Sequence, residues 1–552
     1  MRRSRSASIV VFSIFGNLFQ IWKTIKTQPA GVFSAQYGHA FGQTPTYDRP
    51  LPFVLSGCSL PPLDKRNESR TLTPEQSAAT SLGRGITPLA AAHPGKSGIH
   101  PLSNPYDAFA ARMMLAHAAE RSLDVQYYIW HDDMTGTMLL EALHAAADRG
   151  VRVRLLLDDN GTAGLDTVLA AMDEHPNIEV RLYNPFVLRW PKPLGYVTDF
   201  SRLNRRMHNK SFTADNQATI IGGRNIGDEY FGATNGVLFT DLDVLAIGAA
   251  VNDVSTDFDR YWASESAYPV DRLLKKAEPG ALAALEQRAG KVEKSPEAAT
   301  YADAMRQLPF IRQLLQGDLS LEWANTRMVS DDPRKTLGTA PPEAMLPHQL
   351  HEIIGAPTTN LELVSPYFVP TAAGTEAFAK LAKSGVKVQV LTNALEATDV
   401  AVVHSGYAKR RKDLLASGVE LFEMKRMSGE VERNKSMGPF GSSGSSLHAK
   451  TFAVDGQRIF VGSFNFDPRS ATLNTELGFV IDSPTLARRI ADAFKQDLPD
   501  VAYRVCLDDK GDLYWLEQRN GETLRHDTEP GTTAWKRFSV WFVSLLPLEP
   551  LL

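Results

Sequence analysis

One spacing of polar residues occurs twice in this chain, and it constrains what the rest of the chain must build. In each copy a lysine follows a histidine by two residues, an aspartate by seven and an asparagine by seventeen: His208, Lys210, Asp215 and Asn225, then His448, Lys450, Asp455 and Asn465. A single His-x-Lys often arises by chance, but a full set of matched offsets does not. The repetition therefore indicates a duplicated functional unit.

Each copy of the spacing is predicted to lie on a β-hairpin. Strand-forming residues flank a turn at Asp215 in the first copy and at Asp455 in the second. Because residues i and i+2 of a strand face the same side, the histidine and the lysine of each copy point together. The small pairs Gly-Gly at 222–223 and Gly-Ser at 462–463 let the backbone approach a ligand closely.

The residue types in each copy suit an anionic phosphoryl group, because an imidazole, an ammonium group and amide donors converge there. Ser463 adds a hydroxyl donor in the second copy. Two solvated surface hairpins would be the alternative, but that alternative does not explain why the spacing repeats. Asp215 and Asp455 lie at the hairpin turns, so a structural role stays open for them beside a role in the site.

Two further carboxylates occupy similar local sequences. Asp241 begins the segment D-L-D-V-L-A-I, and Glu476 begins E-L-G-F-V-I. Each is a candidate for orienting a histidine.

The two histidines allow a reaction in two displacements at phosphorus. One attacks a phosphodiester to give a covalent phosphohistidine, and the other protonates the departing alkoxide and later deprotonates the acceptor. Lys210 and Lys450 would offset charge on the phosphoryl oxygens, so neither a metal nor another cofactor is expected. The residues alone do not tell which histidine is the nucleophile.

These motifs resemble the signature of the phospholipase D superfamily, H-x-K-x4-D-x6-G-[GS]-x-N, which two-domain members carry twice. The second copy continues with D-P-R-S at 467–470 and N-T-E at 474–476, as the family's usual extension does. The first continues with N-I-G-D-E-Y-F at 225–231, which is similar to the cardiolipin synthase branch and most of all to its bacterial C-type members. The resemblance runs from about Thr80 to the C-terminus.

The resemblance implies a phosphatidyltransferase that makes cardiolipin, with His208 as nucleophile and His448 as acid and base. A hydrolytic phospholipase D differs only in the acceptor, and a nuclease of the same superfamily would use the same site. The implied substrates are phospholipids, phosphatidylglycerol and also phosphatidylethanolamine, at a membrane surface. The net charge of −4 provides no overall basic field, so no nucleic acid partner is expected.

The order of predicted elements also repeats. A strand at 123–130, a helix at 139–149 and a strand at 150–157 return as a strand at 361–368, a helix at 375–383 and a strand at 385–391. This β-α-β order predicts an α/β fold of two duplicated domains, each a mixed, largely parallel sheet flanked by helices, with the active site between them. We expect a leader or anchor with its linker at 1–78, a first domain at 79–270, a helical connector at 271–317, a second domain at 318–500, and a C-terminal hairpin with an apolar tail at 501–552.

Both ends of the chain suggest attachment to the bacterial cell envelope. An apolar run at 8–22 follows three arginines, and Leu-Ser-Gly-Cys at 55–58 resembles a lipobox, so either an N-terminal anchor or a lipid on Cys58 is expected. The tail at 538–552 is interpreted as an interfacial membrane segment or, alternatively, as a strand of the second domain. Residues 426–446, rich in Gly, Ser and charge, are predicted to form a loop that leads into His448.

Overall fold

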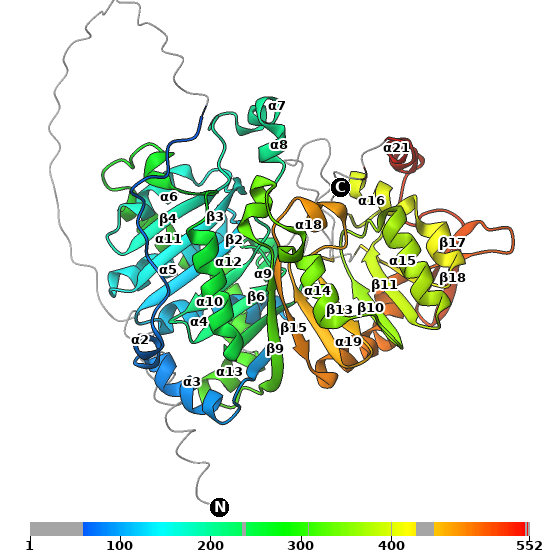
Figure 1. The fold of residues 1–552 in the computed structure, drawn as a ribbon, viewed down its shortest axis with the longest axis horizontal. Coiled ribbons are helices and arrows are strands. Elements are labelled where there is room, and N and C mark those ends of the chain that lie inside the picture. The colour runs from blue at the N-terminus through cyan, green and yellow to red at the C-terminus, as the bar shows by residue number, and fades with distance from the viewer. Residues whose placement is uncertain are drawn as a thin grey trace, which may run out of the picture.

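The computed structural model describes residues 59–234, 239–306, 308–398, 400–426 and 447–546, together with Glu549 and Leu552. The apolar run at 8–22, Cys58 and nearly all of the predicted loop before His448 lie outside these residues. Figure 1 shows two α/β halves beside each other, the first coloured blue to green and the second yellow to red.

The first half is built on one mixed sheet. Across the sheet, the strands are β8 (Ala267–Pro269), β4 (Ile178–Tyr183), β3 (Arg152–Gly161), β2 (Ser122–Ile129), β5 (Ser211–Ala214), β6 (Ala218–Gly222), β7 (Asp243–Gly248), β1 (Ser97–Leu102) and β9 (Glu322–Ser330). Its main helices are α4 (Pro105–Ala118), α5 (Met134–Asp148), α6 (Asp166–Asp173) and α10 (Ala249–Trp262). Between the halves come α11 (Ala281–Glu293), α12 (Pro296–Arg306) and α13 (Pro309–Gln316), and α11 packs against α5 and α6.

The second half repeats this arrangement. Its sheet runs from β9 through β15 (Leu477–Asp482), β14 (Arg458–Gly462), β13 (Thr451–Val454), β10 (Asn360–Val364), β11 (Lys387–Asn393), β12 (Glu420–Met424), β16 (Ala502–Leu507) and β17 (Leu513–Arg519) to β18 (Glu522–His526). Its helices include α14 (Leu346–Ile354), α15 (Thr371–Lys383), α16 (Ala401–Ala408), α17 (Arg411–Ala416), α18 (Pro468–Thr472), α19 (Pro484–Gln496) and α21 (Ala534–Ser544).

Strand β9 belongs to both sheets. Residues 322–324 pair with β1 of the first sheet, and residues 325–330 pair with β15 of the second. A buried apolar cluster follows the same junction, with side chains from both halves: Ile99, Ile221, Val244 and Ala324 with Ile459, Val461, Phe479 and Ile481. The two halves therefore share hydrogen bonds and a core.

Local sequence explains where the helices begin. The Asn104 side chain accepts a hydrogen bond from the backbone N–H of Tyr106, and Pro105 occupies the first turn of α4. Asp133 caps α5 and Ser483 caps α19 in the same way. These caps fix the residues at which the three helices begin.

The predicted duplication and mixed sheets are confirmed, with one difference in pairing. Among the described strands, parallel ladders join β2–β3–β4 and β10–β11–β12, and the other ladders are antiparallel. This parallel share is smaller than predicted, because each motif adds an antiparallel hairpin beside the parallel strands. We propose the predicted domain division with the boundaries unchanged; the boundary at residue 500 falls just before β16, which continues the second sheet.

The C-terminal segment forms the predicted hairpin and then a helix. Asn520 and Gly521 both have positive φ, 55° and 80°, between β17 and β18, as a two-residue hairpin turn requires. The tail after residue 533 forms α21, so its described part is a helix and not a strand. Among the described residues, no helix combines the length and the apolar character needed to cross a bilayer.

Candidate active site

The two histidines are buried where the halves meet. His208 precedes β5 and its backbone N–H donates to the carbonyl of Thr475 in the other half, at 2.9 Å. His448 precedes β13, and its N–H donates to the carbonyl of Thr240 at 2.8 Å. Each histidine is thus held against the segment of the opposite half that carries a candidate carboxylate.

The histidines and carboxylates pair crosswise. His208 Nδ1 lies 2.8 Å from Glu476 Oε2, and His448 Nδ1 lies 2.6 Å from Asp241 Oδ2. Both carboxylates are buried. The structure therefore brings all four predicted residues together and gives each histidine the carboxylate of the other copy. Because each Nδ1 is engaged, Nε2 is the nitrogen that can face a substrate.

The lysines contact the histidine backbone and lower the pKa values of the histidine side chains. Lys210 and Lys450 are buried, and each ammonium donates to the carbonyl oxygen of the histidine two residues before it. Burial together with the two ammonium charges lowers the pKa of His208 well below its ordinary value. Burial and Lys450 lower the pKa of His448 to about 3, although Asp241 opposes the shift. Both imidazoles are therefore neutral at neutral pH, as a nucleophile must be.

The two carboxylates differ in protonation. Burial raises the pKa of Glu476 to about 7, although Lys210 and Ser463 favour its ionised form. Burial also acts on Asp241, but His448 and Lys450 outweigh it and lower the pKa of that carboxyl below its usual range. The His448 pair thus holds a permanent negative charge, while the charge of the His208 pair changes near neutrality.

The residues at 223 and 463, which end the Gly-Gly and Gly-Ser pairs, give the two carboxylates different surroundings. A Cβ on Gly223 would lie 2.2 Å from Asp241 Oδ1, so only glycine leaves room there. Ser463 fills the equivalent position, and its hydroxyl donates to Glu476. Ser463 also presents its carbonyl to His208 Nδ1, at 3.1 Å. In the structure the Ser463 hydroxyl is directed to Glu476, and its donation to a phosphoryl group stays a prediction.

The close contact at Gly223 gives a first testable prediction. Gly223→Ser should reduce turnover by roughly 10²-fold or more, because it displaces Asp241 and so removes support for acid–base work by His448. Gly290→Ser is the matched control, since a Cβ there meets nothing within 4 Å. Steady-state rates and thermal unfolding of both variants check this result. Wild-type turnover by a folded Gly223→Ser protein would contradict it.

The motif aspartates lie away from this centre. Asp215 accepts hydrogen bonds from the backbone N–H groups of residues 120–122, and Asp455 accepts them from residues 358–360. Both adopt positive φ at their turns, and each fixes the start of a neighbouring strand. Asp215 lies five positions along the strand from Lys210, a distance of roughly 16 Å. We therefore propose for Asp215 and Asp455 the structural role that their turn position left open.

The motif asparagines are not equivalent. Asn225 donates from Nδ2 to the Tyr230 hydroxyl at 3.0 Å and accepts from the N–H of Ile129 at 3.2 Å. The side-chain oxygen of Asn465 is buried and has no hydrogen-bond partner among the described residues. Asn225 therefore positions Tyr230 and the end of β2, and its second side-chain N–H is left for a contact with substrate.

Three aromatic rings around the histidines were not predicted as site residues. Tyr128 packs edge-on against His208 with ring centroids 5.0 Å apart, and Tyr230 and Phe239 pack against His448 at 5.2 and 5.1 Å. Tyr127 and Trp130, which lie close to Tyr128 in sequence, are fully buried in the core. Strand alternation along β2 separates Tyr127 from Tyr128, and it is the pattern that could have identified Tyr128.

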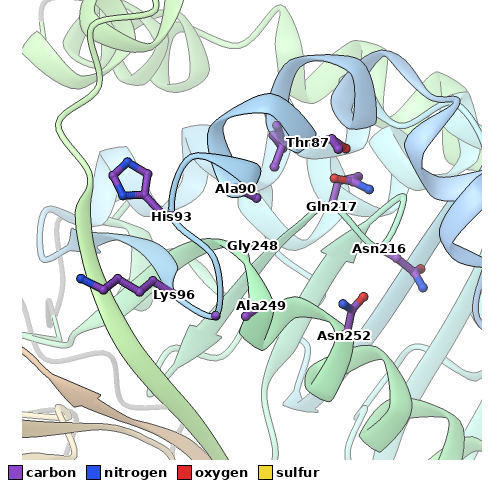
Figure 2. A pocket seen from close by; sticks show the side chains of 11 residues that line it. Thr87, Ala90, His93, Lys96, Asn216, Gln217, Gly248, Ala249 and Asn252 are labelled. Atoms are coloured by element: carbon purple, nitrogen blue, oxygen red, sulfur yellow. The ribbon is translucent and has the colours of Figure 1, made fainter.

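Other polar clusters and cavities contain no motif histidine or lysine. The described residues bring together His144, Asp148 and His175, and separately His131, Asp133 and Glu229, with ligand atoms close enough to share a cation. A cavity of about 270 Å³ lies beside α3 (Ser81–Ala91) and the start of α10, and Figure 2 shows His93, Lys96 and Asn252 around it. These features are separate from the crosswise pairs.

The comparisons with known proteins agree with this geometry. Residues 113–262 and 350–498 match the family described as "Cardiolipin synthase, PLD-like domain". The chain is 51% identical to cardiolipin synthase C of Escherichia coli (strain K12) over 471 residues, which is 85% of this chain and 99% of that protein. It is 25% identical to a cardiolipin synthase of Clostridium perfringens over 386 residues, 69% of this chain and 66% of that protein.

A solved structure supports the fold. The crystal structure of phosphatidylserine synthase from Haemophilus influenzae Rd KW20 superposes with a TM-score of 0.53 at 14% identity, covering 84% of this chain and 100% of that chain. The matches in sequence cover both halves. The chain belongs to the phospholipase D superfamily, in its cardiolipin synthase C-like branch.

Proposed function

We propose that this enzyme makes cardiolipin by transferring a phosphatidyl group to a phospholipid alcohol through a phosphohistidine. The observation that carries the proposal is the crosswise pairing of His208 with Glu476 and of His448 with Asp241 beside two buried lysines. The 51% identity to a cardiolipin synthase C supports the same reaction. Phosphatidylglycerol is the proposed acceptor, and phosphatidylglycerol or phosphatidylethanolamine is the proposed donor.

The first displacement uses neutral His208. Its Nε2 attacks phosphorus, an N–P bond forms, and the P–O bond to the donor headgroup breaks. His448 gives a proton to the departing alkoxide, and ionised Asp241 stabilises the imidazolium from which that proton comes. A phosphate anion beside His448 would raise the pKa of His448 and favour this protonated form.

The second displacement reverses these roles. Neutral His448 takes the proton of the acceptor hydroxyl, the new O–P bond forms, and the N–P bond to His208 breaks. Lys210 and Lys450 face the charge that develops on the phosphoryl oxygens in both steps. Water as acceptor would give phosphatidic acid, the product of a hydrolytic phospholipase D, whereas a nuclease would require a nucleic acid chain in the same site.

Product analysis tests the proposal directly. Purified enzyme is incubated with vesicles of radiolabelled phosphatidylglycerol, with and without phosphatidylethanolamine, and the lipids are separated. Labelled cardiolipin supports transfer, and phosphatidic acid as the main product would replace transfer by hydrolysis. Cleavage of DNA at a rate comparable to lipid turnover would favour the nuclease. His208→Ala is the blank for each assay.

Metal independence is a further expected outcome. Exhaustive treatment with EDTA should leave turnover within about twofold of the untreated enzyme, because Lys210 and Lys450 supply the positive charge that a metal would supply. Thermal unfolding is measured on the same samples, since a cation bound at His144, Asp148 and His175 would affect stability and not chemistry. Loss of turnover in a folded sample, restored by one divalent ion, would contradict the mechanism.

A further inference from the structure

The exposed apolar side chains of this protein are concentrated in two segments. Among the described residues, every exposed large hydrophobic side chain except Leu337 belongs to one of two sets. The first-half patch contains Leu188, Trp190, Leu194, Val197 and Phe200, and the α21 patch contains Trp535, Phe538, Trp541, Phe542, Leu545 and Leu546. Single exposed apolar residues are ordinary, but a cluster of large rings indicates a surface that contacts an apolar partner.

The first-half patch follows the carboxyl end of a parallel strand, and the α21 patch packs against a helix that follows another parallel strand. The first-half patch lies in the connection after β4, with α7 (Gly195–Thr198) and α8 (Phe200–Leu203), and the chain then runs directly to His208. Helix α21 packs against α16, which follows β11. Figure 1 shows α7, α8 and α21 projecting from the same edge of the molecule, on either side of α18.

This edge is also the edge of the catalytic site. Helix α18 begins three residues after Asn465, and Arg469 on α18 donates to the Asn204 side chain at 2.8 Å, directly after α8. Leu447, just before His448, exchanges hydrogen bonds with Asn393 at the end of β11. Hydrogen bonds therefore link the surroundings of both patches to the segments that carry the crosswise pairs.

Each patch is an ordered surface. On α21 the rings of Trp535, Phe538 and Trp541 follow one another with centroids 5.7 Å apart, while Val540 is buried against the protein. In the first-half patch the Tyr196 ring lies between those of Phe186 and Phe200. The exposed side chains are thus held in place by contacts with neighbouring rings and by buried residues of the same segments, so they are exposed in the folded protein.

Charge complementarity identifies the occupant of these patches. Helix α21 carries Lys536 and Arg537 and no acidic residue. The first-half connection carries Arg189, Lys192, Arg202 and Arg205. Arg189 and Lys192 pair with Asp159 and Asp166, and Arg202 pairs with Asp199, so most of the positive charge of this connection is offset and the charge complementarity comes mainly from α21. Tryptophan and phenylalanine beside basic residues suit the headgroup region of a bilayer that contains anionic lipid.

We propose that the first-half patch and the α21 patch dock together on an anionic phospholipid bilayer, so that the catalytic edge faces the membrane. This inference rests on the proposed function, because a lipid-transferring site must receive headgroups from a bilayer. Two separate contacts fix the tilt of the molecule, whereas one contact would let it rotate about that point. Two contacts also bind more durably than one marginal attachment.

The test uses point substitutions in the full chain. Deleting the chain after Arg537 would also remove Glu549, which pairs with Arg410 at 2.8 Å, and Leu552, whose carbonyl accepts from the Arg469 N–H. We therefore choose Trp190→Ser with Val197→Ser in the first-half patch, Trp541→Ser with Phe542→Ser in the α21 patch, and the combination of all four. Val540→Ala is the matched control, on the buried side of α21.

Two substrates separate docking from chemistry. Turnover is measured on vesicles of phosphatidylglycerol mixed with phosphatidylcholine and on monomeric dihexanoyl phosphatidylglycerol. Each double variant should lose about tenfold on vesicles, and the fourfold variant more, while all keep turnover of the monomeric lipid within about twofold. Val540→Ala should change both rates by the same factor. Wild-type turnover of vesicles by the fourfold variant, or equal losses on both substrates, would overturn the proposal.

Vesicle flotation separates this inference from the proposed function. The wild-type chain should float with vesicles that contain phosphatidylglycerol and float less with phosphatidylcholine alone, and the fourfold variant should float less than wild type. This result supports docking even if no cardiolipin forms, in which case only the proposed function fails. Equal flotation of wild type and fourfold variant would overturn docking, whatever the product.

Discussion

Replacing His208 or His448 by alanine should reduce cardiolipin formation by roughly 10²–10⁴-fold or more, and the two variants should fail at different steps. His208→Ala removes the atom that bonds to phosphorus, so no covalent intermediate can form. His448→Ala keeps that atom and lacks the acid and the base. Its first displacement is slowed, and any phosphohistidine that forms also reacts slowly with the acceptor.

The measurement is retention of phosphorus label on the protein. After brief exposure to phosphatidylglycerol labelled at phosphorus, His448→Ala should carry an acid-labile label, and His208→Ala should carry none. His348→Ala on α14 is the control, because that histidine is exposed and pairs with Glu352 at the surface. Acid-labile label on His208→Ala with none on His448→Ala would make His448 the nucleophile and His208 the acid and base. Wild-type turnover by either variant would refute the scheme.

Asp241→Asn should cost roughly 10²–10⁴-fold at every pH between 5 and 9, while the cost of Glu476→Gln should depend on pH. The pKa of Asp241 is lowered, so its carboxylate is ionised throughout this range and asparagine always removes a charge. The pKa of Glu476 is raised to about 7. Below pH 6 glutamine replaces a carboxyl that is already neutral, and above pH 8 it removes a negative charge beside His208.

The ratio of Glu476→Gln to wild-type turnover should therefore fall as pH rises through about 7. Rate profiles of the wild type and both variants on monomeric lipid measure this ratio. Glu352→Gln, on the exposed face of α14, should give a flat ratio. A pH-independent ratio for Glu476→Gln, or a pH-dependent one for Asp241→Asn, would show that the two carboxylates do not differ in the way their surroundings require.

Local patterns predicted the parts of this site, and only long-range geometry could assemble them. The hairpins, the common facing of each histidine and lysine, and the hairpin at residues 513–524 follow from periodicity and turn residues. The exchange of Glu476 and Asp241 between halves does not, because the relation between two copies of a motif is not encoded within either copy. The contact between the Ser463 hydroxyl and Glu476 could not be predicted for the same reason, because the two residues meet only in the folded chain.

The first-half patch could not have been predicted from periodicity. Trp190 lies in a turn and Val197 and Phe200 lie on the four-residue helices α7 and α8, which are too short to show a helical period, and a large apolar residue normally indicates core. In the tail, by contrast, aromatic residues beside Lys536 and Arg537 indicated an interface, and the structure exposes those rings on α21. Exposure of apolar residues depends on which neighbours are present in three dimensions, and sequence does not supply them.

Strand β9, shared by both sheets, bears on how such a chain could have arisen. The edge strand β9 is shared by the two sheets, and each histidine–carboxylate pair takes one residue from each half. A single ancestral copy could therefore have formed such pairs only as a symmetric dimer, in which the two pairs would be identical. Once the copies were joined, a change in one codon no longer altered both pairs. Covalent fusion thereby permitted Asp241 with Gly223 on one side and Glu476 with Ser463 on the other, and so a division of labour that an identical dimer cannot inherit.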